Sequence, residues 1–247
     1  MKTQRLMAAV TALLAGHATG QMVDPDFEIV DGDWAVSGSQ RWFLDGYTEV
    51  EDDVFGFFRV ENTGNPGAQL TLTTSAAGSA EGSSATVAAV RGGPGQSYNQ
   101  FALGAPDRFE MVVDAQFDSG FDEDPVSIHI AIQQNGVDYI STSFETLVGT
   151  TNWVPLLVRA DASDLAFVRA DGSAATSLDF SGFGSSFQVG FAVRSSTDGL
   201  TPRASRVEFD NFVFRAFVPG PGGGGVLAVA GMIGLRRRRR PAAMIRG

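Results

Sequence analysis

The chain has 247 residues, 43% of them hydrophobic and 19% charged, a composition that excludes a disordered chain and a multi-span membrane protein. It contains no cysteine, so disulfides, zinc–thiolate sites and thiol nucleophiles are excluded. Of its 18 basic residues, two lie before residue 6 and six after residue 235, which leaves ten against all 28 acidic residues in the middle (10 − 28 = −18). Such a surface repels phosphate backbones, so we expect no nucleic-acid partner.

Residues 1–20 have the three parts of a secretory signal peptide. Lys2 and Arg5 form the positive start, residues 6–16 form the apolar helix, and Ala18 and Gly20 are the small residues before a cleavage site. The alternative is a short amphipathic helix of the mature chain. It fits less well, because the apolar run is too short to span a bilayer and yet has the flanks of a signal. The sequence therefore predicts export.

Residues 218–247 have the order of a sorting signal. Val218, Pro219 and Pro221 come first, followed by a glycine run, a short apolar segment and the cluster Arg236, Arg237, Arg238, Arg239 and Arg240. This order resembles the PEP-CTERM signals of bacteria that have an exosortase. It departs from them in that Pro-Gly-Pro replaces Pro-Glu-Pro, and its four glycines also resemble tails handled by rhombosortase. The resemblance implies an exosortase-like or rhombosortase-like processing enzyme as partner.

The apolar segment of this tail suits a transient membrane association. Residues 226–235 make about 15 Å of helix, against about 30 Å of hydrocarbon in a bilayer. The arginines that follow hold the end of the segment at the cytoplasmic face. The alternative is a disordered basic tail that binds nucleic acid. The secretory start and the apolar residues directly before the arginines favour a short hydrophobic membrane helix instead.

The sequence of the middle part, 21–217, predicts a single all-β domain. Runs with alternating hydrophobicity are separated by Gly, Asp, Ser and Asn turns; they lie at 54–60, 69–74, 108–117, 126–133, 139–144, 153–160, 165–170, 187–193 and 206–217. Asn135-Gly136 is a strong hairpin signal because both residues tolerate positive φ. The sequence predicts an antiparallel β-sandwich of jelly-roll type, with most of the 19 phenylalanines filling the space between its sheets.

Two stretches carry a family resemblance. The late segments 178–196 and 206–214 resemble the closing strands of concanavalin A-like and carbohydrate-binding jelly-roll domains, and 24–34 resembles their first strand. The resemblance implies a structural calcium ion where first and last strands meet, with Glu28 and Asp210 at the matching positions. Asp31 or Asp33 would add ligands, because calcium needs six to eight oxygens. The alternatives are that Glu28 and Asp210 are ordinary solvated strand residues, or that Asp210-Asn211 caps a turn.

A glycan site is predicted near the start of the domain, where Trp34, Trp42 and Tyr47 lie close in sequence among charged residues. Each could instead be a half-buried aromatic side chain at the sandwich edge. Catalysis has less support. His129 stands in mid-strand, and the sequence has no nucleophile elbow. The acids Glu49, Glu51 and Asp53 alternate onto one face but do not follow the order of concanavalin A-like hydrolases, and a charged edge or turn explains them equally well.

The sequence thus predicts an exported, non-catalytic protein of the bacterial cell envelope or extracellular matrix, with a glycan-binding β-sandwich and extracellular polysaccharide as partner. The alternative is a secreted glycan-active enzyme or lectin of the concanavalin A-like class.

Overall fold

The computed structural model describes the backbone of residues 18–24, 34–44, 47–52, 57–64, 67–91, 97–118, 124–173 and 178–219, and the side chains within these ranges from residue 69 onward except at 91. The part from Thr19 to Val218 forms one compact unit. The predicted signal helix, Pro221, the apolar tail segment and the arginine cluster lie outside the described residues. Strand β1 (Ala18–Asp24) begins before the predicted cleavage point, so a cut after Gly20 would shorten it.

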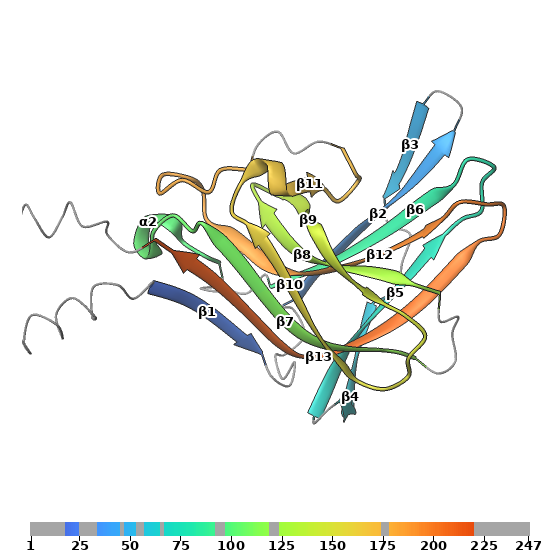
Figure 1. The fold of residues 1–247 in the computed structure, drawn as a ribbon, viewed down its shortest axis with the longest axis horizontal. Helices are drawn as coiled ribbons and strands as arrows, with labels where there is room; N and C mark the ends of the chain where they lie inside the picture. The colour runs from blue at the N-terminus through green and yellow to red at the C-terminus, as the bar shows by residue number, and fades with distance from the viewer. Residues whose placement is uncertain are drawn as a thin grey trace, which may run out of the picture. The chain divides into compact units, whose positions relative to one another are not determined.

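The strands form two antiparallel sheets, as Figure 1 shows. The six-stranded sheet has the order β10 (Val154–Asp161), β7 (Arg108–Phe117), β13 (Arg203–Val218), β5 (Gly67–Ala76) and β4 (Phe57–Gly64), with β1 also paired to β13. The seven-stranded sheet has the order β11 (Phe167–Arg169), β9 (Val137–Leu147), β8 (Val126–Gln134), β12 (Phe187–Thr197), β6 (Ser83–Arg91), β2 (Trp34–Leu44) and β3 (Tyr47–Asp52). The helical segments within the described residues are α2 (Gln100–Leu103) and the 3-10 turn η1 (Asp164–Ala166). The predicted two-sheet antiparallel sandwich is confirmed.

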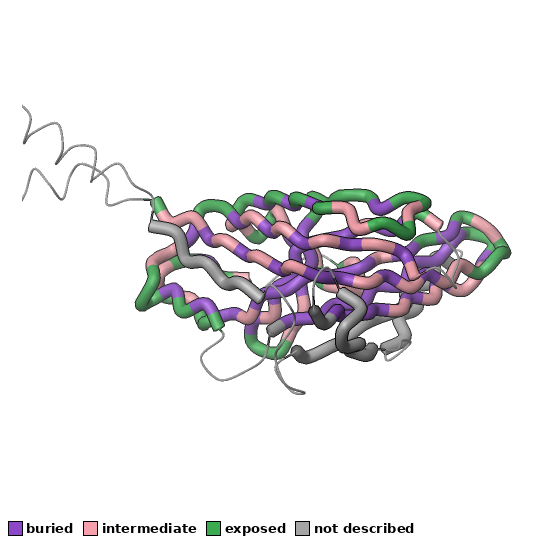
Figure 2. The backbone as a smooth tube through the Cα atoms, turned by 90° about the horizontal axis from the view of Figure 1, so that it is seen from below, coloured by how far each residue is buried: buried purple, intermediate pink, exposed green. Residues whose placement is uncertain are grey.

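The core lies between the two sheets, because alternate residues of each strand point inward. Along β7, every second residue from Phe109 to Phe117 is buried while those between are partly exposed, and Figure 2 shows this alternation over both layers. Phenylalanines supply much of the filling. The Phe109 ring lies 5.2 Å from Phe180 and 5.5 Å from Phe214, counted between centroids.

Two backbone features fix the register of the seven-stranded sheet. Asn135 and Gly136 join β8 to β9 with φ of 56° and 76°, which confirms the predicted hairpin. Gly190 lies where β12 passes close to β6: a Cβ there would stand 1.9 Å from the carbonyl oxygen of Ala89. Only glycine fits this approach.

Candidate functional site

The outer face of the six-stranded sheet is largely taken up by contacts among its own side chains. Arg215 and Arg159 donate to the two carboxylate oxygens of Glu110, at 2.8 and 3.0 Å. Further along the same pair of strands, Gln116 donates to Glu208 at 2.7 Å. Burial opposes ionisation of Glu110, but the hydrogen bonds and charges of both arginines outweigh it and hold its pKa below the usual value. These groups satisfy one another, so we place no ligand on them.

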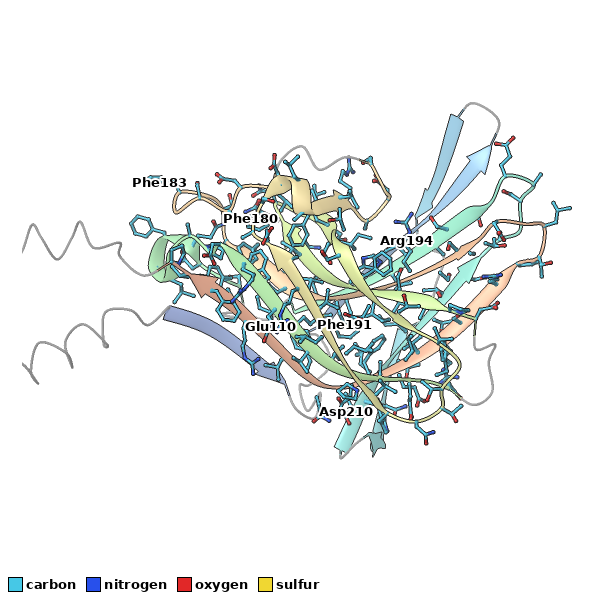
Figure 3. The ribbon with its side chains drawn as sticks, in the orientation of Figure 1. Glu110, Phe180, Phe183, Phe191, Arg194 and Asp210 are labelled. Carbon is cyan, nitrogen blue, oxygen red and sulfur yellow. The ribbon has the colours of Figure 1, made fainter. Side chains whose placement is uncertain are left out.

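Asp210 stands at an irregularity of the same sheet (Figure 3). It is fully buried and lies opposite Asp114 of β7, directly before a bulge in β13 where Asn211 adopts φ of 53°. The backbone N–H of Asn211 donates to Asp210 Oδ1 at 2.7 Å, and Asn211 Nδ2 donates to Asp114 Oδ2 at 2.8 Å. Like charges directly opposite each other in a sheet repel, so two facing carboxylates need donors or a cation between them.

Buried oxygens on the neighbouring strand adjoin this pair. Leu70 of β5 is opposite Phe209 of β13, so Gln69 lies next to Asp210 across the ladder. Gln69 Oε1 and Thr71 Oγ1 are buried and have no hydrogen-bond partner among the described residues. Carboxylate and amide oxygens are the ligands that calcium prefers, so these residues fit the predicted ion as part of its shell.

The described residues do not complete such a shell. Nowhere in the described ranges do three or more His, Cys, Asp or Glu side chains gather as a metal-binding group. Glu28, Asp31 and Asp33, the other predicted ligands, lie outside the described residues.

The outer face of the seven-stranded sheet carries a different arrangement. Phe144 of β9 is 53% exposed and lies opposite His129 of β8, with the two ring centroids 5.2 Å apart. His129 Nδ1 lies 2.7 Å from the carbonyl oxygen of Ser141, which can only accept, so Nδ1 carries the proton. Nε2 then accepts from the Ser127 hydroxyl at 2.8 Å. Burial, aided by the charge of Arg194, lowers the pKa of His129 to about 4, so the ring is neutral at pH 7.

Arg194 of β12 extends this group of side chains. It lies opposite Ser127 of β8 and Thr86 of β6, and its Nη2 donates to Ser84 Oγ at 3.2 Å. An exposed ring, a hydroxyl and a half-buried guanidinium thus lie on neighbouring strands of one face. We call Phe144, Ser127 and Arg194 the Phe144 surface.

The predicted aromatic residues lie in the same sheet, nearer its edge. Trp42 is opposite Glu49, and Tyr47 is opposite Leu44, so the register brings Trp42 and Tyr47 to one end of the β2–β3 pair. Trp34 stands eight residues from Trp42 in the same strand, about 26 Å away. The register therefore separates Trp34 from the other two. The side chains of all three lie outside the described part of the structure.

Ser127 and His129 have the separation of a nucleophile and its base, but not the surroundings. Nδ1 is bonded to a backbone carbonyl rather than to a carboxylate. A pKa of about 4 also makes the imidazole a weak base at neutral pH, because an efficient general base titrates near the working pH. Through Ser141, His129 holds β8 against β9, and its contact with Ser127 suggests no reaction.

The Phe144 surface was missed by sequence reasoning. Alternation along 126–133 could have placed Ser127 and His129 on one face, but not Phe144 or Arg194, which come from other strands. Of the predicted sorting signal, Val218 ends β13 and Pro219 follows it. Over the part of the chain that the structure describes, no helix has the length and apolarity needed to cross a membrane.

No family model matches the chain, and no curated protein matches its sequence. Among solved structures, it is similar to a family 11 carbohydrate-binding module from Clostridium thermocellum in complex with a β-1,3-1,4-mixed-linked tetrasaccharide (12% identity, 81% of this chain and 96% of that chain, TM-score 0.43). It is also similar to a family 22 xylan-binding domain from Paenibacillus barcinonensis (14% identity, 83% of this chain and 99% of that chain, TM-score 0.40). A third similar structure is a protein of unknown function from Shewanella oneidensis (11% identity, 86% of this chain and 94% of that chain, TM-score 0.39). Similarities at this level assign neither a ligand nor an activity to this chain.

Proposed function

We propose that this chain is an exported, non-catalytic protein of the cell envelope or extracellular matrix, whose sandwich binds glycan on the outer face of the seven-stranded sheet. The Phe144 surface carries the proposal. A pyranose ring offers an apolar C–H face and a rim of hydroxyls, which match an exposed aromatic ring beside a guanidinium donor and a hydroxyl oxygen that can accept. The excess of acidic residues in 21–217 favours a neutral polysaccharide over an acidic one.

The two ends of the chain support the envelope part of the proposal. The N-terminal sequence has the order of a signal peptide, and the tail has the order of a sorting signal. In this proposal an exosortase-like or rhombosortase-like enzyme cuts near Pro219 and Pro221, which ends the membrane association through the apolar segment. The released sandwich is then retained by extracellular polysaccharide.

Glycan binding is tested by affinity electrophoresis in gels that contain mixed-linkage β-glucan, xylan or an acidic polysaccharide. We expect retardation by a neutral polysaccharide, weakened at least about tenfold by Phe144→Ala. Trp42→Ala should leave it unchanged, because the register pairs Trp42 with Ser83, which alternates to the face opposite Thr86 and Arg194. Leu157→Ala is the matched control, because Leu157 is a partly exposed apolar residue of β10 in the other sheet. Retardation that Phe144→Ala leaves unchanged would show that the glycan face is elsewhere.

A glycan-active enzyme is the alternative. It predicts release of reducing ends from the retarding polysaccharide, lost in Glu51→Gln or Ser127→Ala. Binding without turnover would support the non-catalytic function.

We further propose that Asp210, Asp114 and Gln69 hold part of a structural calcium ion, with Glu28 as a further ligand. The ion would tie the first strands to the last and would take no part in glycan chemistry. Its supporting observation is the buried carboxylate of Asp210, which faces the partly exposed carboxylate of Asp114 beside an amide oxygen without a described partner.

A further inference from the structure

One end of the sandwich displays large apolar side chains to solvent. Phe101 and Leu103 of α2 are 81% and 51% exposed, and Phe183 of the loop before β12 is 93% exposed. Figure 3 shows Phe183 at the same end of the sandwich as α2. We call these three residues the apolar end.

The loop that carries Phe183 is fixed to α2 by buried side chains. The amide Nε2 of Gln100, a fully buried residue, donates to the carbonyl oxygens of Asp179 and Ser185 at 2.8 and 2.9 Å. Nε2 of the buried Gln134 donates to the same two oxygens at 3.0 and 2.7 Å. Buried polar groups contribute only when they are paired, and here they hold both ends of the loop. Phe183 is therefore held out in solvent by the fold.

The C-terminal tail leaves the sandwich beside this end. Strand β13 ends at Val218, whose Cγ1 would lie 2.7 Å from a Cβ placed on Gly104, the C-cap of α2. The N–H of Asp107, just after α2, donates to the carbonyl oxygen of Phe217 at 2.9 Å. Figure 1 shows β13 terminating next to α2.

The length of the tail limits how far this end can stand from a membrane. Six residues, 220–225, separate Pro219 from the apolar segment, and six extended residues reach about 20 Å. The apolar segment itself spans only about half of a bilayer. A tether this short gives the apolar end a high local concentration at the bilayer surface.

We infer that the apolar end inserts Phe101, Leu103 and Phe183 into the interface of a lipid bilayer while the tail is attached. This inference rests on the proposed membrane association of the tail. The exposed Asp107 and Asp161 lie near this end and outnumber the exposed Arg108, which is opposite Asp161, so the surface suits zwitterionic lipid better than anionic lipid.

The test uses the full chain and single cysteine labels, which are specific because the chain contains no cysteine. Phe183→Cys carries an environment-sensitive nitrobenzoxadiazole dye. Leu200→Cys is the matched control, because Leu200 is 76% exposed in the turn between β12 and β13, which packs on Gly78 at the opposite end of β12. Both proteins are mixed with phosphatidylcholine vesicles, floated on a density gradient and measured by fluorescence.

We expect co-flotation, with a blue shift and at least twofold brightening of the dye at 183 and no change at 200. Phe101→Ser with Leu103→Ser should reduce the apparent partition coefficient at least about tenfold. Flotation without a shift at 183 overturns the inference but leaves the tail association standing. No flotation overturns both. A shift at 183 that grows with protein concentration in the absence of vesicles shows a second copy of the chain on this surface, and also overturns the inference.

A further variant separates the two proposals. Leu227→Asp with Ile233→Asp places charges in the apolar segment of the tail. If flotation and the shift at 183 persist in this variant, the apolar end binds lipid by itself and the proposed role of the tail is wrong. If both disappear while the unaltered tail gives the shift at 183, the apolar end acts only when tethered, as inferred.

Discussion

Replacing Asp210 by Asn tests whether the facing carboxylates need a cation. Asn keeps an oxygen that can accept from the N–H of Asn211, so the substitution mainly removes a charge. Directly opposite side chains stand about 5 Å apart, and two charges at that distance repel by about 3 kcal/mol at an effective dielectric constant of 20. Because Asn211 donates to both carboxylates, we expect about 1–2 kcal/mol of this repulsion to remain in chelator.

Thermal unfolding in chelator and in calcium measures both effects. In the presence of a chelator, Asp210→Asn should raise Tm by about 2–4 °C for each kcal/mol of carboxylate repulsion that it relieves. For the unaltered protein, calcium at 100 times its Kd should raise the free energy of unfolding by about 2.7 kcal/mol. This gain should be absent in Asp210→Asn. Glu110→Gln is the control, because it removes a carboxylate from the same sheet face and should keep the calcium response. A lower Tm of Asp210→Asn in chelator, with no calcium response in either protein, would refute the reasoning and show that the chain itself neutralises Asp210.

Three further predictions concern stability. The pKa of His129 in the folded protein is about 4, below the ordinary 6.5, so the unfolded state takes up the proton first as pH falls. The free energy of unfolding therefore falls by about 3 kcal/mol between pH 6.5 and 4. Urea unfolding should show a smaller fall in His129→Gln, and an equal fall would contradict the burial argument. Glu110→Gln breaks two ion pairs of a carboxylate that is only 13% exposed and should lower the free energy of unfolding by about 1 kcal/mol. Arg159→Gln removes one partner of this carboxylate, a side chain that is 60% exposed, and should lower it by less than about 0.5 kcal/mol in the same assay. Phe191→Ala opens a cavity beside Phe209, whose ring lies 4.4 Å away, and should cost about 3–5 kcal/mol; a loss below about 1 kcal/mol would show that the site collapses around the smaller side chain.

The strands that were predicted are those in which bulky apolar residues alternate with polar ones. The run 108–117 coincides with β7. The hairpin at Asn135 could be predicted because its turn needs positive φ, which few residue types adopt. Strand β6 was not predicted, since Ser83–Arg91 is built from small residues and follows a glycine- and serine-rich stretch. Its partner Gly190 shows the reason: the neighbouring strands approach so closely there that small residues are required. Tertiary packing, not local propensity, selects this sequence.

The candidate site was less predictable than the fold, because register decides which residues meet. Trp34 and Trp42 are close in sequence but lie at opposite ends of β2. Phe144 reaches His129 only through a bulge in β9, where Ser141 accepts from the imidazole. Asp210 was singled out by its place in the last strand, but Asp114 and Gln69 come to it from β7 and β5 through pairings that one sequence does not reveal.

The positions of the two proposed surfaces predict that glycan and membrane binding do not compete. Gln134 contacts the loop of the apolar end, and His129, which supports the Phe144 ring, lies five residues earlier in β8, about 17 Å away along the strand. A sandwich that meets the bilayer with its end therefore keeps the outer face of the seven-stranded sheet in solvent. We expect vesicle-bound chain to bind the retarding polysaccharide within about twofold of the affinity of the chain in solution. A loss of tenfold or more on vesicles would mean that the sandwich lies on the membrane with its glycan face, and the orientation inferred from the apolar end would be wrong.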